Sequence, residues 1–324
     1  MVIGNTNLKH GLLLAPMAGF SDRALRYVAR LHGAEMSTTE MVSAKAVCYN
    51  DEKTFRLARI LGDEGSVSVQ IFGSEPSIMA QAAAKITELE YGGERPVAID
   101  INMGCPVKKI FTNNEGAALM AHPDLIYKIV NSVSEAIDIP CTVKMRVGID
   151  ENSKNAIECA LAAEAGGASM IALHGRTRAA LYSGKIDKET IKSVKEAVKI
   201  PLVANGDIMD AKSALEMLYE TGADGIMIGR GALGNPFIFE EIKCALEEKN
   251  YSPPSLEERS ETALLQLRVA IEDKGEQIAV REARGQIAFY LKGFRGAARL
   301  RGDINRAVSY RDVEMAFLEC LKSP

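Results

Sequence analysis

The 324-residue sequence lacks any stretch that approaches the roughly 18 uninterrupted apolar residues a membrane-spanning helix needs. Its early apolar run, residues 12–15, is cut by Pro16 and followed by Asp22 and Arg23, which argues against a signal peptide. The six cysteines have no C-x-x-C spacing, and none of the four histidines lies near a cysteine or another histidine. These absences argue against a disulfide framework and a metal site. We therefore expect a soluble cytoplasmic protein with reduced thiols.

The composition is that of an ordinary globular protein. Hydrophobic residues make up 47% of the chain, charged residues 25% and aromatic residues 6%, with a mean hydropathy of −0.03. These values exclude disordered, collagen-like and coiled-coil proteins. The length allows one α/β domain of roughly 250 residues plus a small one, or two to three medium-sized domains.

Short apolar runs alternate with longer amphipathic stretches over most of the chain. The predicted strands are Leu12–Met17, Ala34–Thr38, Val67–Ile71, Val97–Asn102, Cys141–Met145, Met170–His174, Leu202–Asn205 and Gly225–Ile228. The predicted helices between them include Ser77–Leu89, Pro123–Ile137, Ser153–Ala165, Lys188–Val198 and Ala211–Tyr219. This alternation indicates a parallel sheet with crossover helices. Eight strands in this length favour a closed (β/α)8 TIM barrel over an open doubly wound sheet.

The pattern changes at residues 251–254, where two consecutive prolines predict a linker. Beyond it Ser255 and Glu258 form a capping box that opens a helix, and Gly275 closes it. A second helix is predicted through Ile287, Tyr290 and Leu291, and a last one opens at Ser309 with Asp312. We therefore expect two domains, a barrel over residues 1–250 and a small all-α helical domain over residues 251–324.

Positive charge concentrates in the tail although the chain as a whole carries a net charge of −4. Between Arg281 and Arg306 there are seven basic residues and two acidic ones: Arg281, Arg284, Lys292, Arg295, Arg299, Arg301 and Arg306 against Glu282 and Asp303. A basic stripe of this kind is a candidate phosphate-backbone contact for a nucleic acid. The alternative is an ordinary solvated helix face.

Polar or special-geometry residues follow nearly every predicted strand, and the carboxyl ends of barrel strands are where chemistry collects. The last two strand ends, residues 205–207 and 229–231, lie at the usual phosphate corner of this fold. Their glycines allow backbone N–H groups to approach an anion, and Arg230 adds charge. The phosphate could belong to a sugar phosphate or to flavin mononucleotide (FMN).

Four further strand ends carry candidate functional side chains. Lys144 and Gln70 are donors of the kind that a flavin ring requires, with a salt bridge inside the barrel as the alternative for Lys144. His174 is either functional or a satisfied structural histidine. Cys105 lies on a turn between Gly104 and Pro106, where an unactivated thiol can act as an acid. Four other cysteines are expected to be small buried hydrophobes: Cys141, Cys159, Cys244 and Cys320.

Taken together, these strand ends resemble the tRNA-dihydrouridine synthase family, most closely its bacterial B-type branch. The motifs that carry the resemblance begin at Leu14 (L-A-P-M-A-G-F-S-D), Gln70 (Q-I-F-G), Asp100 (D-I-N-M-G-C-P-V-K-K), Thr142 (T-V-K-M-R-V-G), Leu173 (L-H-G-R-T-R), Ala204 (A-N-G-D-I) and Ile228 (I-G-R-G-A-L-G-N-P). The N-x-G-C-P-x-K-K element is the specific one, whereas A-P-M and G-R also occur in other flavin barrels.

The resemblance implies an FMN-binding TIM barrel, a helical RNA-binding domain and NADPH-dependent reduction of the C5–C6 bond of uridines in tRNA. Hydride would pass from the reduced flavin to C6, and Cys105 would give a proton to C5. Asn102 and Arg146 would face the uracil. FMN would be held by Pro16, Met17, Ala18, Gln70, Lys144, His174, Asn205, Gly206, Asp207, Gly229 and Arg230. The basic stripe Arg281–Arg306 would contact tRNA, and the protein is expected to be a monomer.

One stretch departs from the family pattern. Where the family carries Arg-Lys-His followed by Trp-Tyr, this chain has Arg284-Gly-Gln-Ile-Ala-Phe-Tyr290. A structured RNA other than tRNA is therefore one alternative substrate. A small-molecule FMN barrel of the dihydroorotate dehydrogenase type is a second, and a barrel lyase or isomerase acting on a sugar phosphate is a third. An RNA-binding protein with a decayed flavin site is the least favoured reading, because every motif position for FMN is present.

Overall fold

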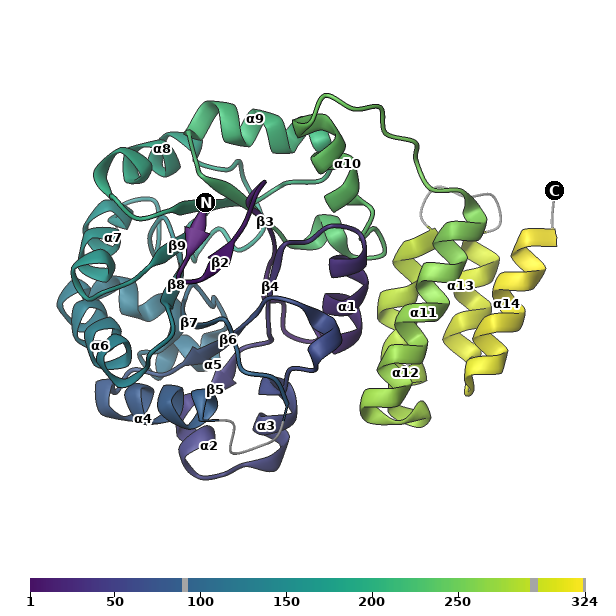
Figure 1. Cartoon of the computed structure of the whole chain (residues 1–324), viewed down its shortest axis with the longest axis horizontal. Coiled ribbons are helices and arrows are strands. Elements are labelled where there is room, and N and C mark those ends of the chain that lie inside the picture. Colours follow the sequence, from purple (N-terminus) through teal and green to yellow (C-terminus); the bar gives the residue numbers. More distant parts are fainter. Residues whose placement is uncertain (89–92, 292–296, 323–324) are drawn as a thin grey trace.

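The computed structural model of the chain describes residues 1–88, 93–291 and 297–322. Figure 1 shows a ring of strands surrounded by helices, with a separate bundle of helices beside α1. None of the described helices is long and apolar enough to cross a membrane. All six cysteines are free, as expected, but Cys244 and Cys320 are only half-buried and so are not core hydrophobes.

Eight parallel strands form the ring, one for each predicted strand. They are β3 (Leu12–Leu14), β4 (Met36–Thr38), β6 (Val67–Phe72), β7 (Ala98–Met103), β8 (Cys141–Arg146), β9 (Met170–His174), β10 (Leu202–Asn205) and β11 (Gly225–Ile228). Each pairs with the next in chain order, β11 pairs with β3, and the pairing of β4 with β6 completes the ring. A short extra strand, β5 (Val42–Ser43), pairs with the end of β6. The predicted TIM barrel is confirmed.

The barrel interior is filled by side chains that alternate with outward-facing ones along the strands. Leu13, Met36 and Val203 lie inside, fully buried, whereas their strand neighbours pack against the outer helices. An antiparallel hairpin, β1 (Val2–Ile3) with β2 (Thr6–Asn7), adds Ile3 and Leu8 to this interior cluster. The interior is thus a packed core, and a cavity opens at the opposite, carboxyl end of the strands.

Helices cover the outside of the ring. The main ones are α1 (Arg23–Leu31), α4 (Pro76–Thr87), α6 (Pro123–Ala136), α7 (Ala156–Ala165), α8 (Lys188–Ala197), α9 (Ala211–Thr221) and α10 (Ile238–Leu246). Shorter helical segments are α2 (Ala44–Cys48), α3 (Glu52–Ala58), α5 (Lys108–Thr112), η1 (Gly62–Glu64), η2 (Gly116–Ala121) and η3 (Arg230–Ala232). Aspartates begin several of them. The side chain of Asp22, for example, accepts a hydrogen bond from the Leu25 amide at the start of α1.

Several predicted boundaries need correction. The first barrel strand ends at Leu14 rather than Met17, because Pro16 has no N–H to continue the ladder. The second begins at Met36 rather than Ala34. The helix predicted from Ser153 begins at Ala156, since residues 151–152 form a turn and Lys154 pairs with Gly148 in an isolated β-bridge. Leu89, the predicted end of another helix, lies outside the described residues.

The tail contains α11 (Leu256–Lys274), α12 (Glu276–Gln286), η4 (Ile287–Leu291), α13 (Ala297–Arg306) and α14 (Tyr310–Lys322). The capping box of Ser255 with Glu258 and the start at Ser309 with Asp312 are confirmed. The second helix runs through Leu291 as predicted, but it is α-helical only as far as Gln286. From Ile287 to Leu291 it tightens to the 3-10 helix η4, where residues 289–290 lie directly against Gly234. No helix was predicted over α13.

The tail and the barrel share one buried apolar cluster. Ala24 of α1 and Phe237, just before α10, belong to the same cluster as Leu267 of α11 and Tyr290 of η4. The division at residue 250 therefore stays a prediction, although no helix or strand occupies residues 247–255 between the two parts.

Gly285 offers a direct test of helix stability in the tail. It lies in α12 at an exposed position, and a Cβ added there would meet no atom within 4 Å. We expect Gly285→Ala to raise the free energy of unfolding by about 0.5–1 kcal/mol, because alanine loses less backbone entropy in a helix. Denaturant unfolding measures this.

Gly275 provides the matched control. A Cβ there also meets nothing within 4 Å, but its φ is +81°. Gly275→Ala should therefore be destabilising, and equal effects of the two substitutions would contradict the explanation.

Candidate active site

All fourteen predicted site residues line a single cavity of about 600 Å³. It opens at the carboxyl ends of the strands, where residues distant in the sequence converge. The predicted residues in its wall are Pro16, Met17, Ala18, Gln70, Asn102, Cys105, Lys144, Arg146, His174, Asn205, Gly206, Asp207, Gly229 and Arg230. Their roles stay predictions, but their convergence on one cavity is a property of the fold.

Three aromatic residues in the wall were not among the predicted site residues: Phe20, Tyr182 and Phe289. Tyr182 lies in the loop after β9, eight residues beyond the strand end, and is 60% exposed. Phe289 comes from η4 of the tail and is 44% exposed. The position of Phe289 depends on Gly234, whose φ of +63° leaves room for the backbone of residues 289–290. The sequence shows that Phe289 and Tyr290 lie within the basic stripe, but it does not show that Phe289 reaches the barrel.

Cys105 lies at the cavity as a thiol rather than a thiolate. Its side chain is 8% exposed, and burial raises the pKa of the thiol above its ordinary value. The carboxamide oxygen of Asn102 accepts hydrogen bonds from the backbone amides of Cys105 at 2.9 Å and Gly104 at 3.2 Å. The turn that carries the thiol is thus held by the end of β7, and the thiol retains a proton at neutral pH.

The amides of Asn102 and Gln70 are joined to each other. Asn102 Nδ2 donates to Gln70 Oε1 at 2.8 Å, and Gln70 Nε2 donates to the buried carboxylate of Asp100 at 2.7 Å. Gln70 has a second amide hydrogen and a second lone pair available, whereas Asn102 Oδ1 already accepts two hydrogen bonds and the second Asn102 amide hydrogen faces Met41 Sδ at 3.5 Å. Gln70 can therefore hold a ligand in the cavity while keeping its bonds, and Asn102 can do so by giving up the weak contact with Met41.

Lys144 donates from Nζ to Asn205 Oδ1 at 3.0 Å, and Asn205 Nδ2 donates to the Met227 carbonyl at 2.6 Å. No ion pair of Lys144 occurs among the described residues, so the salt-bridge alternative is not supported. Burial, together with the nearby Arg146 guanidinium, lowers the pKa of Lys144 to about 8. The ammonium group is therefore a buried cation that a ligand with partial negative charge would stabilise.

Arg146 is 5% exposed and bonded to backbone carbonyls rather than to an acid. Its Nε donates to Gly104 O at 2.8 Å, and its Nη1 donates to Thr177 O at 3.0 Å and Leu181 O at 3.2 Å. The guanidinium thus ties the Cys105 turn to the loop that carries Tyr182, while it keeps a place in the cavity wall.

The predicted phosphate corner contains an ion-pair network that includes a residue the sequence analysis did not assign. Arg176 donates to both carboxylate oxygens of Asp207, at 2.8 and 2.5 Å, and Arg230 Nη2 lies 3.2 Å from Asp207 Oδ1. The hydrogen bonds from Arg176 lower the pKa of Asp207. Asp207 and Gly206 have φ of +48° and +130°. With the carboxylate engaged by two arginines, we infer that Asp207 contributes its backbone to anion binding.

His174 is not a satisfied structural histidine. Its Nδ1 is buried and has no hydrogen-bond partner among the described residues. Burial, and repulsion from the surrounding Lys144 and arginines, lower the pKa of His174 to about 2. The ring is therefore neutral and offers an unpaired polar atom beside the cavity, which is a sign of a missing ligand.

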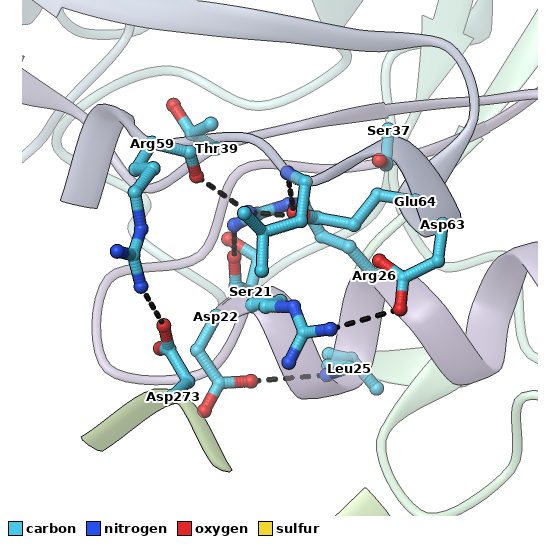
Figure 2. Close-up of polar contacts among 12 residues, drawn as sticks. Ser21, Asp22, Leu25, Arg26, Ser37, Thr39, Arg59, Asp63, Glu64 and Asp273 are labelled. Atoms are coloured by element: carbon cyan, nitrogen blue, oxygen red, sulfur yellow. Dashed lines mark hydrogen bonds and ion pairs between the residues drawn. The ribbon is translucent and has the colours of Figure 1, made fainter. Parts of the chain in front are cut away.

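The loop of residues 16–22, which supplies Pro16, Met17 and Ala18 to the cavity, is anchored by the buried ion pair shown in Figure 2. Arg26 of α1 contacts Glu64 at 2.6 Å, with both side chains at most 2% exposed. Arg26 Nη1 also donates to the Ser21 carbonyl at 2.9 Å, and Ser21 Oγ accepts from the Met17 amide at 2.7 Å. The barrel helix α1 thus positions the loop by a hydrogen bond from the Arg26 side chain to the loop backbone.

The tail holds the same loop from the other side. Lys274 of α11 lies 2.6 Å from the Asp22 carboxylate. Tyr290 donates to Gln266, Gln266 donates to Gln286, and Gln286 Nε2 donates to the Gly19 carbonyl at 3.2 Å. Gln286, one of the positions that departs from the family pattern, is therefore buried between the tail and the barrel. Its identity bears on the packing of the tail rather than on surface charge.

The basic stripe is only partly available for a ligand. Lys292 and Arg295 lie outside the described residues. Arg284 donates to the Ala307 carbonyl at 2.8 Å, whereas Arg299 and Arg306 form exposed ion pairs with acids of the tail. Arg281 and Arg301 are exposed and have no ion-pair partner within the part of the tail that the structure describes. Exposed pairs are weak, so phosphates could displace them.

Known proteins match this chain over its whole length. The family model described as dihydrouridine synthase matches residues 13–323. A probable tRNA-dihydrouridine synthase of Rickettsia conorii is 41% identical, over 94% of this chain and 91% of its own. The tRNA-dihydrouridine synthase B of Vibrio vulnificus is 41% identical, over 99% of this chain and 98% of its own.

Among solved structures, a 6-hydroxypseudooxynicotine amine oxidase from Pseudomonas geniculata N1 is similar, with a TM-score of 0.57. It is 12% identical and the match covers 76% of this chain and 49% of that one, so the likeness concerns the fold alone. The match to the family model and the identity with the two full-length relatives show that the chain belongs to the dihydrouridine synthase family.

Proposed function

We propose that the protein reduces the C5–C6 bond of uridines in tRNA to 5,6-dihydrouridine, with FMN as bound cofactor and NADPH as reductant. The observation that carries the proposal is that Cys105, Lys144, His174 and Arg230 all line one cavity. The names of the full-length relatives support tRNA as the substrate. The expected enzyme is a cytoplasmic monomer.

The residues present fit FMN. Positive φ at Gly206 and the neighbouring Arg230 suit a phosphate that approaches the backbone closely. The unpaired Nδ1 of His174 and the second hydrogens of the Gln70 and Asn205 amides provide neutral polar contacts. Lys144 provides the buried charge for the part of the ring that carries negative charge on reduction. When bound and reduced, the flavin would supply hydride to the substrate.

The chain's own residues would then bind the base and move a proton. Cys105 would donate the proton from Sγ to C5 of the uracil, and burial keeps that proton in place at neutral pH. Asn102 and Arg146 would hold the uracil carbonyls, since both reach the wall beside Cys105. The base must leave the RNA stack to enter, at a cost of a few kcal/mol. Phosphate contacts of the tail, beginning with Arg281 and Arg301, would offset this cost.

The buried ammonium of Lys144 has a measurable consequence. Since its pKa is about 8 in the folded chain and that of the unfolded chain is ordinary, the folded protein binds fewer protons between pH 8 and about 10.5. The free energy of unfolding of flavin-free protein should therefore rise with pH in this window, by up to about 3 kcal/mol relative to Lys144→Met. Equilibrium unfolding at several pH values measures the difference. Parallel pH profiles for the two proteins would contradict a buried charge.

The function is tested by dihydrouridine content in cells with and without this protein. Nucleoside mass spectrometry is applied separately to tRNA and rRNA, and the deletion is complemented with wild type or with Cys105→Ala. We expect dihydrouridine to disappear from tRNA and to return only with wild type. If dihydrouridine is lost from rRNA alone, the substrate is rRNA rather than tRNA. If the dihydrouridine content of both RNAs is unchanged, the proposal that the protein reduces RNA is refuted.

A further inference from the structure

Asp100 has no place in the proposed mechanism, yet it is a carboxylate in the middle of a barrel strand. It lies on β7, and only 1% of the residue is exposed. Burying a carboxyl group is costly unless its oxygens are hydrogen-bonded. Here one oxygen accepts from Thr142 Oγ1 at 2.6 Å and the other accepts from Gln70 Nε2 at 2.7 Å. The residue therefore needs an explanation beyond core packing.

One chain of hydrogen bonds leads from the Cys105 turn to this carboxylate. The Cys105 amide donates to Asn102 Oδ1, Asn102 Nδ2 donates to Gln70 Oε1, and Gln70 Nε2 donates to Asp100. A side-chain amide can be turned end for end at little steric cost, so each one takes its orientation from its neighbour. The orientation is fixed at both ends, because the backbone N–H groups of Gly104 and Cys105 require the oxygen of Asn102 and the oxygen of Asp100 requires the NH2 group of Gln70.

We propose that Asp100 is a positioning residue for Cys105, acting through Gln70 and Asn102. Without an acceptor at position 100, the buried NH2 group of Gln70 has no partner there, and a turn of Gln70 would set its NH2 group against that of Asn102. Asn102 then loses the acceptor that holds its NH2 group, or turns as well and gives up the hydrogen bonds from Gly104 and Cys105. The turn keeps its bonds to Arg146 and Ala117, but it is held less firmly and the thiol becomes more accessible. The catalytic consequence rests on the proposed function of Cys105, whereas the structural consequence does not.

Two substitutions separate the acceptor from the charge. Asp100→Leu removes the acceptor and keeps the number and branching of the side-chain heavy atoms, although leucine is the larger residue. Asp100→Asn keeps an oxygen for Gln70, because its NH2 group can face Thr142, whose hydroxyl can accept as well as donate. If the acceptor matters, Asp100→Asn should behave like wild type in the position and activity of Cys105, whereas Asp100→Leu should not. If instead the negative charge matters, for example towards Lys144, both substitutions fail equally.

The first readout is the alkylation rate of Cys105 in the flavin-loaded protein. Iodoacetamide labelling is followed by peptide mass spectrometry, with the half-buried Cys48, outside the cavity wall, as internal reference. We expect Asp100→Leu to raise the Cys105 rate about tenfold, because the lost hydrogen bonds free the turn. Asp100→Asn should remain within about threefold of wild type, and Cys48 should not change. This readout needs no RNA, so it is independent of whether tRNA is the substrate.

The second readout is turnover on tRNA. Asp100→Leu should lower kcat about tenfold or more with KM for tRNA nearly unchanged, and Asp100→Asn should restore kcat. Unchanged alkylation of Cys105 in Asp100→Leu would overturn the proposal, as would equal effects of Leu and Asn. Should Asp100→Leu fail to fold, Gln70→Met interrupts the chain one link nearer to the thiol. It should raise the Cys105 alkylation rate in the same way, and no change there would also overturn the proposal.

Discussion

Replacing Cys105 with alanine is expected to lower kcat for dihydrouridine formation by about 10²–10⁴-fold, the usual contribution of a positioned general acid. The thiol is the protonated donor in the wall of the cavity, and no other cysteine lines it within the described residues. FMN content and the rate of flavin reduction by NADPH should stay as in wild type, because the Cys105 side chain is not needed for either. Single-turnover kinetics on undermodified tRNA measure the chemical step.

The control for this substitution is Cys48→Ala, which removes a half-buried thiol outside the cavity wall and should leave kcat unchanged. The pH profile adds a second check. Because burial raises the pKa of Cys105, the wild-type rate should be flat through neutral pH and fall only when the pH rises above the ordinary thiol range. If the Cys105→Ala enzyme keeps a near-normal rate, another group must donate the proton to C5.

Removing Glu64 alone is expected to cost about 3–5 kcal/mol of unfolding free energy, because it leaves the buried Arg26 guanidinium without its counter-charge. The two side chains are 2% and 0% exposed and lie 2.6 Å apart, so water cannot replace the lost partner. Denaturant unfolding of Glu64→Leu measures the loss. Arg26→Met should be similarly destabilising, since it leaves a buried carboxylate and an unbonded Ser21 carbonyl.

The double variant Arg26→Met with Glu64→Leu separates the charge from the packing. Replacing both members of a buried pair with apolar residues is often neutral, so most of the lost stability should return. If the double variant is as unstable as the sum of the single ones, the pair stabilises by packing or hydrogen bonding rather than by charge compensation. An exposed pair such as Arg299 with Glu319 is the comparison, and breaking it should change stability by less than about 1 kcal/mol.

The barrel and the residues of its cavity could be predicted from local sequence. Strands such as Met170–His174 and Leu202–Asn205 occur as predicted, because an apolar run bounded by glycine, proline or polar residues is a local signal. Once the barrel is recognised, the carboxyl ends of its strands must share one face. The convergence of Cys105, Lys144 and Arg230 therefore follows from topology alone.

What the sequence could not reveal depends on contacts between segments that are far apart in the chain. Phe289 reaches the cavity because the tail lies on Gly234, and Gln286 is buried because its amide meets the Gly19 carbonyl. Likewise Asp100 is an acceptor for Gln70, and Asp207 is turned towards Arg176, only after the strands have paired. Hydrophobic periodicity predicts which elements form and which face is buried. The direction of a hydrogen bond and the partner of a charge are decided by distances of a few ångströms, which exist only in the folded chain.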